Sequence, residues 1–446
     1  MSISATSGLI SNIDYASLIT QLVSLKKIPM TQLSAEKKTL SNQNTAYSNL
    51  NSRVNDLKTS AEALKTSDSF NVFSASTTSS TILGATAGST ATSGSYEVIV
   101  EALAKAHKVA ANGLSSDTTA GLVASGAASI TLQVGTGTAQ TINVDATTTL
   151  TGLKDSINTL DMGITASIVN DGDPTNPYRL ILTSDTTGTA NALTITEDTS
   201  LNFATTLQSA ANATFKVDNL SFTRATNSVT DVITGVTLDL KSADAATTVT
   251  LSVARNVSAI QSKVSDLLNR YNGVVTYIKA NNRYNTDTKV AGSLYGDTVA
   301  RSIWDDLRRN MTGAISGLPS TMNRLIHVGV EIDKDGNFSL DSTKFTDAIE
   351  SDFDGVMNLF IDGATTDGFG KRVYDLADDM TDTIDGRIQE RIDGLAKNIK
   401  RIDFDISNKE KALTAYEEQL RTQFTALETM LSSIQAQGKF LASLTS

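Results

Sequence analysis

A heptad repeat of apolar residues near the C-terminal end constrains the fold of this chain more than any other stretch. Between residues 388 and 434, polar residues interrupt the repeat only at Lys409 and Gln423. Its apolar positions hold Ile388, Ile392, Leu395, Ile399, Ile402, Ile406, Leu413, Tyr416, Leu420, Leu427, Met430 and Ile434. Such a repeat is typical of a coiled coil, in which a helix buries one stripe against a partner helix. A helix of roughly 70 Å needs a partner of similar length.

Two other stretches have the same period and could be that partner. Near the start of the chain the repeat holds Leu33, Leu40, Tyr47, Val54 and Ala61, with Leu50, Leu57 and Leu64 between the later members. In the middle it holds Val257, Ile260, Val264, Leu267, Tyr271, Val274 and Ile278. We therefore favour one intramolecular bundle of antiparallel helices. Self-association of the C-terminal helix alone is the alternative, and sequence does not separate the two.

Length and composition narrow the class of protein. The 446 residues are enough for about three domains, and the chain has no cysteine for disulfides or thiolate chemistry. A net charge of −11 argues against nucleic-acid or anionic-membrane partners. No apolar run approaches the ~20 residues of a membrane-spanning helix. The first basic residue is Lys26, so the positive segment of a signal peptide is missing. We expect a protein without membrane insertion, either cytoplasmic or exported by a route that reads no such signal.

Between the first and the central heptad stretches the composition shifts to Ser, Thr, Ala and Gly, which favours β structure. Short alternating or β-branched runs bounded by Gly, Asn and Asp predict strands. They lie at 96–100, 129–134, 141–144, 164–169, 178–183, 192–196, 214–217, 220–224, 236–240 and 248–253. A helix is predicted from Leu150 to Asn158, after a Thr cluster able to cap it.

The rest of the chain is predicted to be mainly helical. An amphipathic helix carries Leu18, Leu22 and Leu25 and is expected to end at Pro29. Further helices are predicted at 296–311, 342–361 and 371–384. A hairpin is predicted to pair 327–332 with 337–340 across a turn containing Gly336.

These elements predict an α+β multidomain fold. Its parts are an antiparallel coiled-coil bundle from both chain ends and a central helix, two inserted Thr-rich β domains, and flexible terminal segments. The predicted boundaries are a flexible N-terminal segment at 1–32, a coiled-coil helix at 33–70, an inner β domain at 71–95 and 200–255, an outer β domain at 96–199, a helical domain at 256–435 and a flexible C-terminal segment at 436–446.

The sequence has few residues in patterns typical of catalysis or metal binding. The loop from Asp333 to Asn337 is similar to a calcium loop, but Gly stands at its fourth position rather than its sixth, so a turn is the better interpretation. His107 and His327 have no companion ligands at metal-binding spacing. There is no Gly-rich phosphate loop, Ser elbow or Cys nucleophile. The sequence predicts no enzyme activity, no cofactor and no metal.

Collinear motifs over nearly the whole chain resemble one family, the bacterial flagellar filament cap proteins, also called flagellar hook-associated protein 2. They include the opening residues 3–14, the strand motif at 93–104, and a segment at 148–169 similar to the hook-type insertion repeat of flagellar axial proteins. Later motifs lie at 235–238, 271–272, 294–297, 328–330, 336–341, 356–360 and 423–428. At 328–330 the chain has Val-Gly-Val where the family usually has Leu-Gly-Ile, a conservative departure.

The resemblance implies a homo-oligomeric ring, a pentamer or hexamer, at the distal end of the filament, where it promotes flagellin insertion and filament elongation. It implies contacts with flagellin and hook-filament junction proteins. It also implies export by the flagellar type III apparatus without a cleaved signal peptide, and a cytoplasmic export chaperone on the C-terminal helix. The partner-binding leg surface carried over from the family comprises Leu18, Leu22, Leu25, Leu427, Met430, Leu431, Ile434, Phe440 and Leu441.

Physical reasoning reaches part of this expectation separately. The apolar stripe of a heptad repeat forms a seam with its partner helix. Seam residues without a local partner should stay exposed in a monomer, and fully burying each one contributes very roughly 1.5–3 kcal/mol of free energy. A surface adhesin, with a coiled-coil stalk and β heads that bind host glycan or protein, is the alternative function. It shares the composition, but it predicts neither the collinear motifs nor heptad seams at both chain ends.

Overall fold

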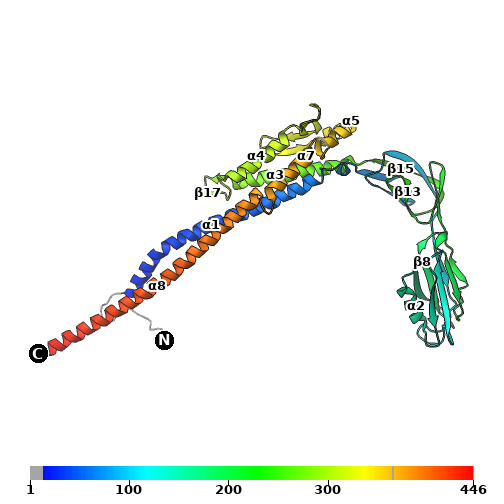
Figure 1. The fold of residues 1–446 in the computed structure, drawn as a ribbon, viewed down its shortest axis with the longest axis horizontal. Helices are drawn as coiled ribbons and strands as arrows, with labels where there is room; N and C mark the ends of the chain where they lie inside the picture. The colour runs from blue at the N-terminus through cyan, green and yellow to red at the C-terminus, as the bar shows by residue number, and fades with distance from the viewer. Residues whose placement is uncertain (1–13, 364–365, 445–446) are drawn as a thin grey trace. The chain divides into compact units, whose positions relative to one another are not determined.

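The computed structural model describes residues 14–363 and 366–444. The chain divides into two compact units: a helical unit from 1–70 and 260–446, and a β unit from 71–259. Both chain ends and the central helix belong to the helical unit, and the β unit is inserted between them (Figure 1). The predicted fold class is therefore confirmed. Residues 1–13 and 445–446 of the predicted terminal segments lie outside the described residues.

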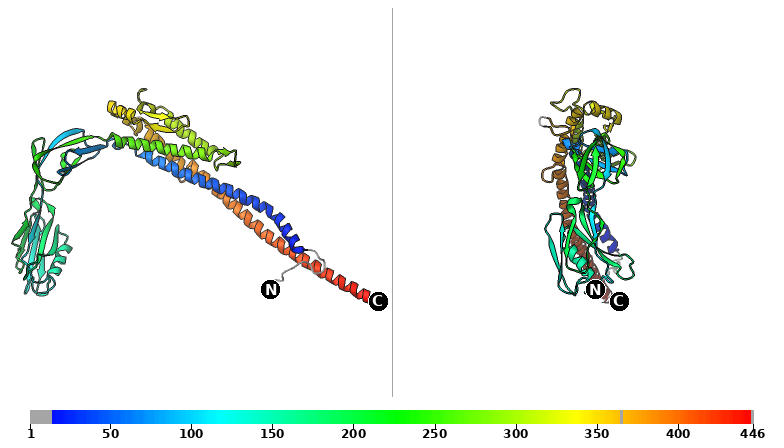
Figure 2. Two further views of the ribbon diagram at one scale, coloured as in Figure 1. Left: turned by 180° about the vertical axis from the view of Figure 1, so that it is seen from behind. Right: turned by 90° about the vertical axis from the view of Figure 1, so that its right-hand side faces the viewer.

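The helical unit is built around two long helices that lie side by side in opposite directions (Figures 1 and 2). These are α1 (Tyr15–Glu62) and α8 (Arg387–Leu444). Tyr15 stacks on Phe424 at 4.8 Å between ring centroids, and further along Lys37 forms an ion pair with Asp403. The other helices are α3 (Val257–Asn281), α4 (Thr298–Thr312), α5 (Ser342–Ser351), α6 (Phe353–Phe360) and α7 (Phe369–Thr381).

The three heptad seams meet inside this one unit. In the N-terminal seam, the positions from Tyr47 on α1 to Leu64 just past its end are fully buried, whereas Leu33 and Leu40 are half-buried. On α3, the seam from Ile260 to Ile278 is buried. On α8, burial falls along the helix: Ile388, Leu395, Ile402 and Leu420 are buried, whereas Leu427, Met430 and Ile434 are exposed. The intramolecular bundle predicted from the shared period is the arrangement that the structure has.

The prediction that Pro29 ends a first helix is wrong, because α1 runs without a break through this residue. Proline lacks the N–H that would bond to the carbonyl of Leu25, and its ring crowds that carbonyl, which costs about 3 kcal/mol in a helix interior. The turns before Pro29 nevertheless bury Tyr15 and Ile19, and Met30 is buried just after it. Packing of these turns along α8 offsets the local cost.

Replacing Pro29 with alanine is expected to stabilise the helical unit by about 2 kcal/mol, since the lost helix penalty outweighs the smaller entropy gain of the unfolded chain. Denaturant unfolding followed by circular dichroism measures this. Ser34→Ala, an exposed change on the same helix, is the matched control and should shift stability by only a few tenths of a kcal/mol. Destabilisation by Pro29→Ala would mean that the proline-dependent geometry is itself needed for packing.

The smaller elements of the helical unit follow the prediction with local differences. The hairpin consists of β18 (Val330–Ile332) and β19 (Phe338–Leu340), because 325–328 forms a 3-10 turn instead of strand. A second hairpin, β16 (Tyr284–Asn285) with β17 (Val290–Ala291), was not predicted. The single helix expected at 342–361 is two helices. Asp352 leaves helical geometry with φ of −151° and its side chain caps α6 through the N–H of Gly355.

The C-terminal segment predicted to be separate from residue 436 continues α8 through residue 444. The reason is local composition: Ala436, Gln437 and Lys439 are good helix formers, and a single Gly438 among them costs only about 1 kcal/mol. Residues 15–32 of the predicted N-terminal segment are likewise part of α1.

The β unit contains two hydrophobic cores. The strands of the first are β1 (Phe73–Thr77), β2 (Leu83–Ala87), β3 (Gly94–Ala102), β11 (Ala213–Val217), β12 (Leu220–Arg224), β13 (Ser228–Ile233), β14 (Val236–Leu240) and β15 (Asp244–Arg255). They form antiparallel sheets in the orders β1-β15-β3-β11-β12 and β13-β14-β2. Phe215, Leu238 and Leu251 lie fully buried between these sheets.

The second core belongs to the sheets β10-β4-β8-β7 and β6-β5-β9 with one helix. The elements are β4 (Ala106–Ala110), β5 (Ala128–Val134), β6 (Gln140–Val144), α2 (Leu150–Thr159), β7 (Ile164–Asn170), β8 (Tyr178–Thr187), β9 (Leu193–Glu197) and β10 (Thr205–Gln208). The hydroxyl of Thr149 accepts a hydrogen bond from the N–H of Gly152 and caps α2, as the Thr cluster predicts.

The boundaries predicted for the outer β domain, 96 and 199, need correction. β3 is a central strand of the five-stranded sheet and therefore belongs to the inner domain. At the other end, β10 pairs with β4, so the outer domain continues past 199 until Ala211 bridges to Lys105. Strand pairing, which composition does not report, decides both boundaries.

Candidate functional site: the apolar end of the helix pair

The candidate site lies where α8 continues past the described start of α1. Figure 2 shows the end of α8 extending beyond α1. The predicted residues Leu427, Met430, Ile434, Phe440 and Leu441 are all exposed there, Met430 by 61% and Leu441 by 63%, and Leu431 is half-buried. Large apolar side chains this exposed at successive turns are unusual for a helix of a globular protein, so this surface is suited to binding a partner.

Helical spacing sorts these residues by face. Leu427, Met430, Ile434 and Leu441 are separated by three, four and seven residues, so they lie along one stripe of α8. Leu431 lies closer to the direction of Phe424, which packs on α1. Phe440 falls six residues after Ile434 and therefore points away from the stripe. The structure thus brings four of the predicted α8 residues into one stripe and places Leu431 and Phe440 outside it.

A matching stripe runs along the first turns of α1. Leu18, Leu25 and Ile28 are exposed, by 41%, 63% and 50%, and Leu22 is half-buried. The alternate face holds Tyr15, Ile19 and Met30, which are buried. Ile28 was not predicted, although it stands three residues after Leu25, because Pro29 was taken as the end of the helix.

The aromatic pair of Tyr15 and Phe424 separates the two stripes. Leu18 lies one turn into α1 from this pair, and Leu427 lies one turn further out on α8. The carboxylate of Asp14 accepts a hydrogen bond from the N–H of Ser17 at 3.0 Å and caps α1. The start of α1 is therefore held on α8, with apolar side chains exposed on both helices.

A polar junction holds the two helices where they enter the bundle. The Asp297 carboxylate accepts hydrogen bonds from the Tyr47 hydroxyl at 2.5 Å and from Arg391 at 3.0 Å. Burial acts to raise the pKa of Asp297, but hydrogen bonds from Tyr47, Ala300 and Arg391 hold it below its ordinary value. Burial and the Asp297 carboxylate together raise the pKa of Tyr47 well above its ordinary range.

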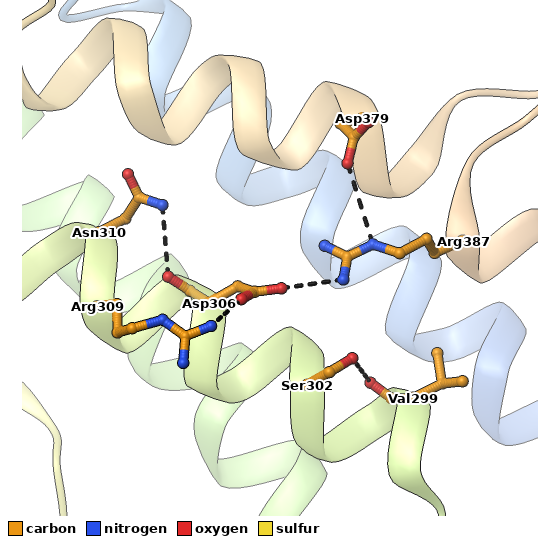
Figure 3. A network of polar contacts seen from close by, with 7 residues as sticks. All are labelled: Val299, Ser302, Asp306, Arg309, Asn310, Asp379 and Arg387. Atoms are coloured by element: carbon orange, nitrogen blue, oxygen red, sulfur yellow. Dashed lines mark hydrogen bonds and ion pairs between the residues drawn. The ribbon is translucent and has the colours of Figure 1, made fainter.

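A second polar network links α4, α7 and α8 close by (Figure 3). The Asp306 carboxylate accepts from Arg387 at 2.9 Å and also pairs with Arg309 on its own helix. Arg387 lies 4.0 Å from Asp379 of α7. These groups are partly exposed, so the network positions the helices more than it stabilises them.

The residues considered for chemistry have structural roles. Nδ1 of His107 accepts a hydrogen bond from the N–H of Leu193, and Nδ1 of His327 accepts one from the N–H of Asn323. The Asp333 carboxylate accepts from the N–H groups of Asp335 and Asn337 and closes the hairpin turn. Within the part of the chain that the structure describes, no cluster of three or more His, Cys, Asp or Glu could hold a metal ion. Nor does that part contain a helix long and apolar enough to cross a membrane.

This combination defines a class of protein by its architecture: a helix pair from both chain ends, an apolar stripe on each helix, and inserted β domains. Sequence profiles narrow the class. The flagellar hook-associated protein 2 C-terminus matches residues 210–436, its N-terminus matches 11–107, and the flagellin hook IN motif matches 129–186. The chain belongs to the flagellar hook-associated protein 2 family. The third match includes the segment at 148–169 predicted to be a hook-type repeat.

Relatives and a solved structure agree with this assignment. The chain is 28% identical to the B-type flagellar hook-associated protein 2 of Pseudomonas aeruginosa, over 94% of this chain and 93% of the relative. It is 26% identical to flagellar hook-associated protein 2 of Escherichia coli, over 97% and 96%. A crystal structure of three domains of the Escherichia coli flagellar cap protein superposes with a TM-score of 0.67 at 27% identity, covering 79% of this chain and 99% of that one.

Proposed function

We propose that this protein is a subunit of the cap at the distal end of the bacterial flagellar filament, where it promotes flagellin insertion and filament elongation. The observation that supports this proposal most strongly is the likeness, over 79% of this chain, to a solved flagellar cap protein. The family is structural, so the proposed activity is assembly rather than catalysis. No observation favours the alternative role as an adhesin.

The proposed contact with the filament is the pair of apolar stripes. Leu18, Leu22, Leu25, Leu427, Met430, Leu431, Ile434, Phe440 and Leu441 form the proposed partner-binding set, to which the structure adds Ile28. Burying several such side chains supplies binding energy without one dominant contact. That suits a cap, because its contacts must break and re-form each time a subunit enters beneath it. Flagellin and the hook-filament junction proteins are the proposed partners.

Assembly and export complete the proposal. The cap is a homo-oligomer, a pentamer or hexamer, located outside the cell at the flagellar tip. The chain reaches this place through the flagellar type III apparatus without a cleaved signal peptide. Before export, a cytoplasmic chaperone covers the exposed stripe of α8. This order follows from the apolar exposure of α8, because an uncovered stripe favours aggregation in the cytoplasm.

Negative-stain electron microscopy tests the proposed function. Purified protein is mixed with short flagellin filaments and monomeric flagellin. We expect plates bound at one filament end and growth beneath them. Filaments that grow equally with and without the protein, and that carry no end-bound plates, would overturn the proposal. A matched sample with the β unit alone, residues 71–259, controls for non-specific plates, because it lacks both stripes.

A further inference from the structure

The strongest feature not used by the proposed function is the buried Asp297 side chain, which lies in the helical unit far from the apolar stripes along α1. Its side chain is 6% exposed, which is rare for a carboxylate unless its bonds are satisfied. Three segments distant in sequence meet on it: Tyr47 of α1, Arg391 of α8, and the first turn of α4. One carboxylate therefore joins both chain ends to the central part of the chain.

Every oxygen of Asp297 has a partner. One oxygen accepts from the Tyr47 hydroxyl and from the N–H groups of Val299 and Ala300, at 2.9 and 3.2 Å for the two N–H groups. The other accepts from Nη2 of Arg391 at 3.0 Å. The Arg391 guanidinium also lies 5.8 Å from the Tyr47 ring centroid, so the two partners of Asp297 contact each other as well.

The turn before α4 fixes this carboxylate in place. Leu294 is fully buried, and its N–H donates to the carbonyl of Asn281 at 3.0 Å. Gly296 follows with φ of +72°, a geometry that disfavours other residues, and its N–H donates to the Asn282 side chain at 2.9 Å. Asp297 is thus presented by a rigid turn instead of a mobile loop.

The junction stands where the environment of the helix pair changes. On the bundle side, Leu50, Val54 and Leu57 of α1 are fully buried. On the other side, Leu40 and Leu33 are half-buried, and in Figure 1 α1 and α8 continue as a pair past the ends of α3 and α4. We call residues 15–46 of α1 and 392–424 of α8 the helix-pair arm.

We propose that Asp297 acts as a clamp that keeps the two helices of the arm together at the point where they leave the bundle. A two-helix stretch whose seam is only partly buried opens more readily than a bundle core, so its stability depends on how firmly its base is held. The clamp supplies that hold from a third element, α4, which is not part of the arm. Asp297 is therefore a positioning residue for the arm.

Hydrogen exchange of the 446-residue, cysteine-free chain tests the clamp. Asp297→Ser keeps a side-chain oxygen that can cap α4, but the serine side chain is too short to reach both Tyr47 and Arg391. We expect amides at 33–46 and 392–406 to exchange at least about tenfold faster, while α3 and α7 keep their protection. Tyr47→Phe, a milder variant, should give a smaller change in the same segments. In the double variant, the acceleration of exchange in the arm should be smaller than the combined effects of the two single variants, because the two residues share one hydrogen bond.

Asp341→Ser is the matched control, because Asp341 caps α5 in the same way, through the N–H groups of Thr343 and Lys344. It should leave exchange in the arm unchanged. Two results would overturn the clamp: unchanged exchange in the arm of a folded Asp297→Ser protein, or equal acceleration in all helices of the unit, which would make Asp297 an ordinary stabilising residue. If Asp297→Ser does not fold, Tyr47→Phe decides by the same two criteria.

Discussion

Aspartate at both Leu18 and Leu427 is expected to abolish filament growth in cells that depend on this protein as their cap. Each leucine is more than 40% exposed in the monomer, so the fold should tolerate the change. In the bound state, each leucine would bury apolar surface worth roughly 1.5–3 kcal/mol, and a carboxylate there is unpaired as well. The double variant should bind filament ends at least about a hundredfold more weakly. Swimming assays and the amount of unpolymerised flagellin in the medium measure the result.

The matched control places the same charges on the other side of each helix. Thr20 and Ser432 are exposed and lie on the side of each helix away from its stripe, so Thr20→Asp with Ser432→Asp should leave motility and filament length near normal. Circular dichroism of both double variants should show the same helix content. Normal motility with the double leucine variant, or equal loss with the Thr20→Asp and Ser432→Asp double variant, would show that the apolar stripes are not the contact.

Leu57→Ala is expected to destabilise the helical unit by about 2–5 kcal/mol, the range for a buried leucine whose cavity collapses only partly. Leu57 is fully buried on α1. Because the bundle is built from both chain ends, the loss should weaken α8 as well as α1. Unfolding followed by hydrogen exchange should show both long helices opening together at lower denaturant, while the protection of the β unit is unchanged.

Leu238→Ala is the reciprocal control for this experiment. Leu238 is fully buried in the first core of the β unit, so its truncation should weaken that unit by a similar amount and leave α1 and α8 protected. If Leu57→Ala weakened α1 but left α8 unaffected, the two helices would be held by separate partners. The intramolecular bundle would then be wrong.

Periodicity predicted the helical unit well because a seven-residue repeat reports burial directly. The α3 seam from Ile260 to Ile278 and the late α1 positions from Tyr47 to Leu64 are buried as the pattern requires. The gradual loss of burial along α8 was also predictable, because the seam of α1 weakens toward Leu33. On α8, Leu427, Met430 and Ile434 belong to this repeat, whereas Leu431, Phe440 and Leu441 were predicted from the family resemblance alone.

Other features depend on tertiary contacts that leave little trace in the sequence. Proline is unfavourable inside a helix, yet α1 continues through Pro29 because Tyr15 stacks on Phe424 of α8 and Ile19 is buried. The boundary of the outer β domain was missed because strand pairing, which composition does not report, assigns β3 and β10 to their sheets. Asp297 was noted as part of a family motif, but its junction with Tyr47 and Arg391 joins residues about 250 and 94 positions apart. No local pattern reports such a contact.

The position of the protein on a growing filament tests the proposed cap function most directly. The chain lacks cysteine, so Thr175→Cys, in an exposed loop of the β unit, gives a single site for a fluorescent label on living cells. We predict one labelled spot at the distal tip of each filament, which stays at the tip as the filament lengthens. Label spread along the filaments, or confined to the cell surface, would contradict the proposed function.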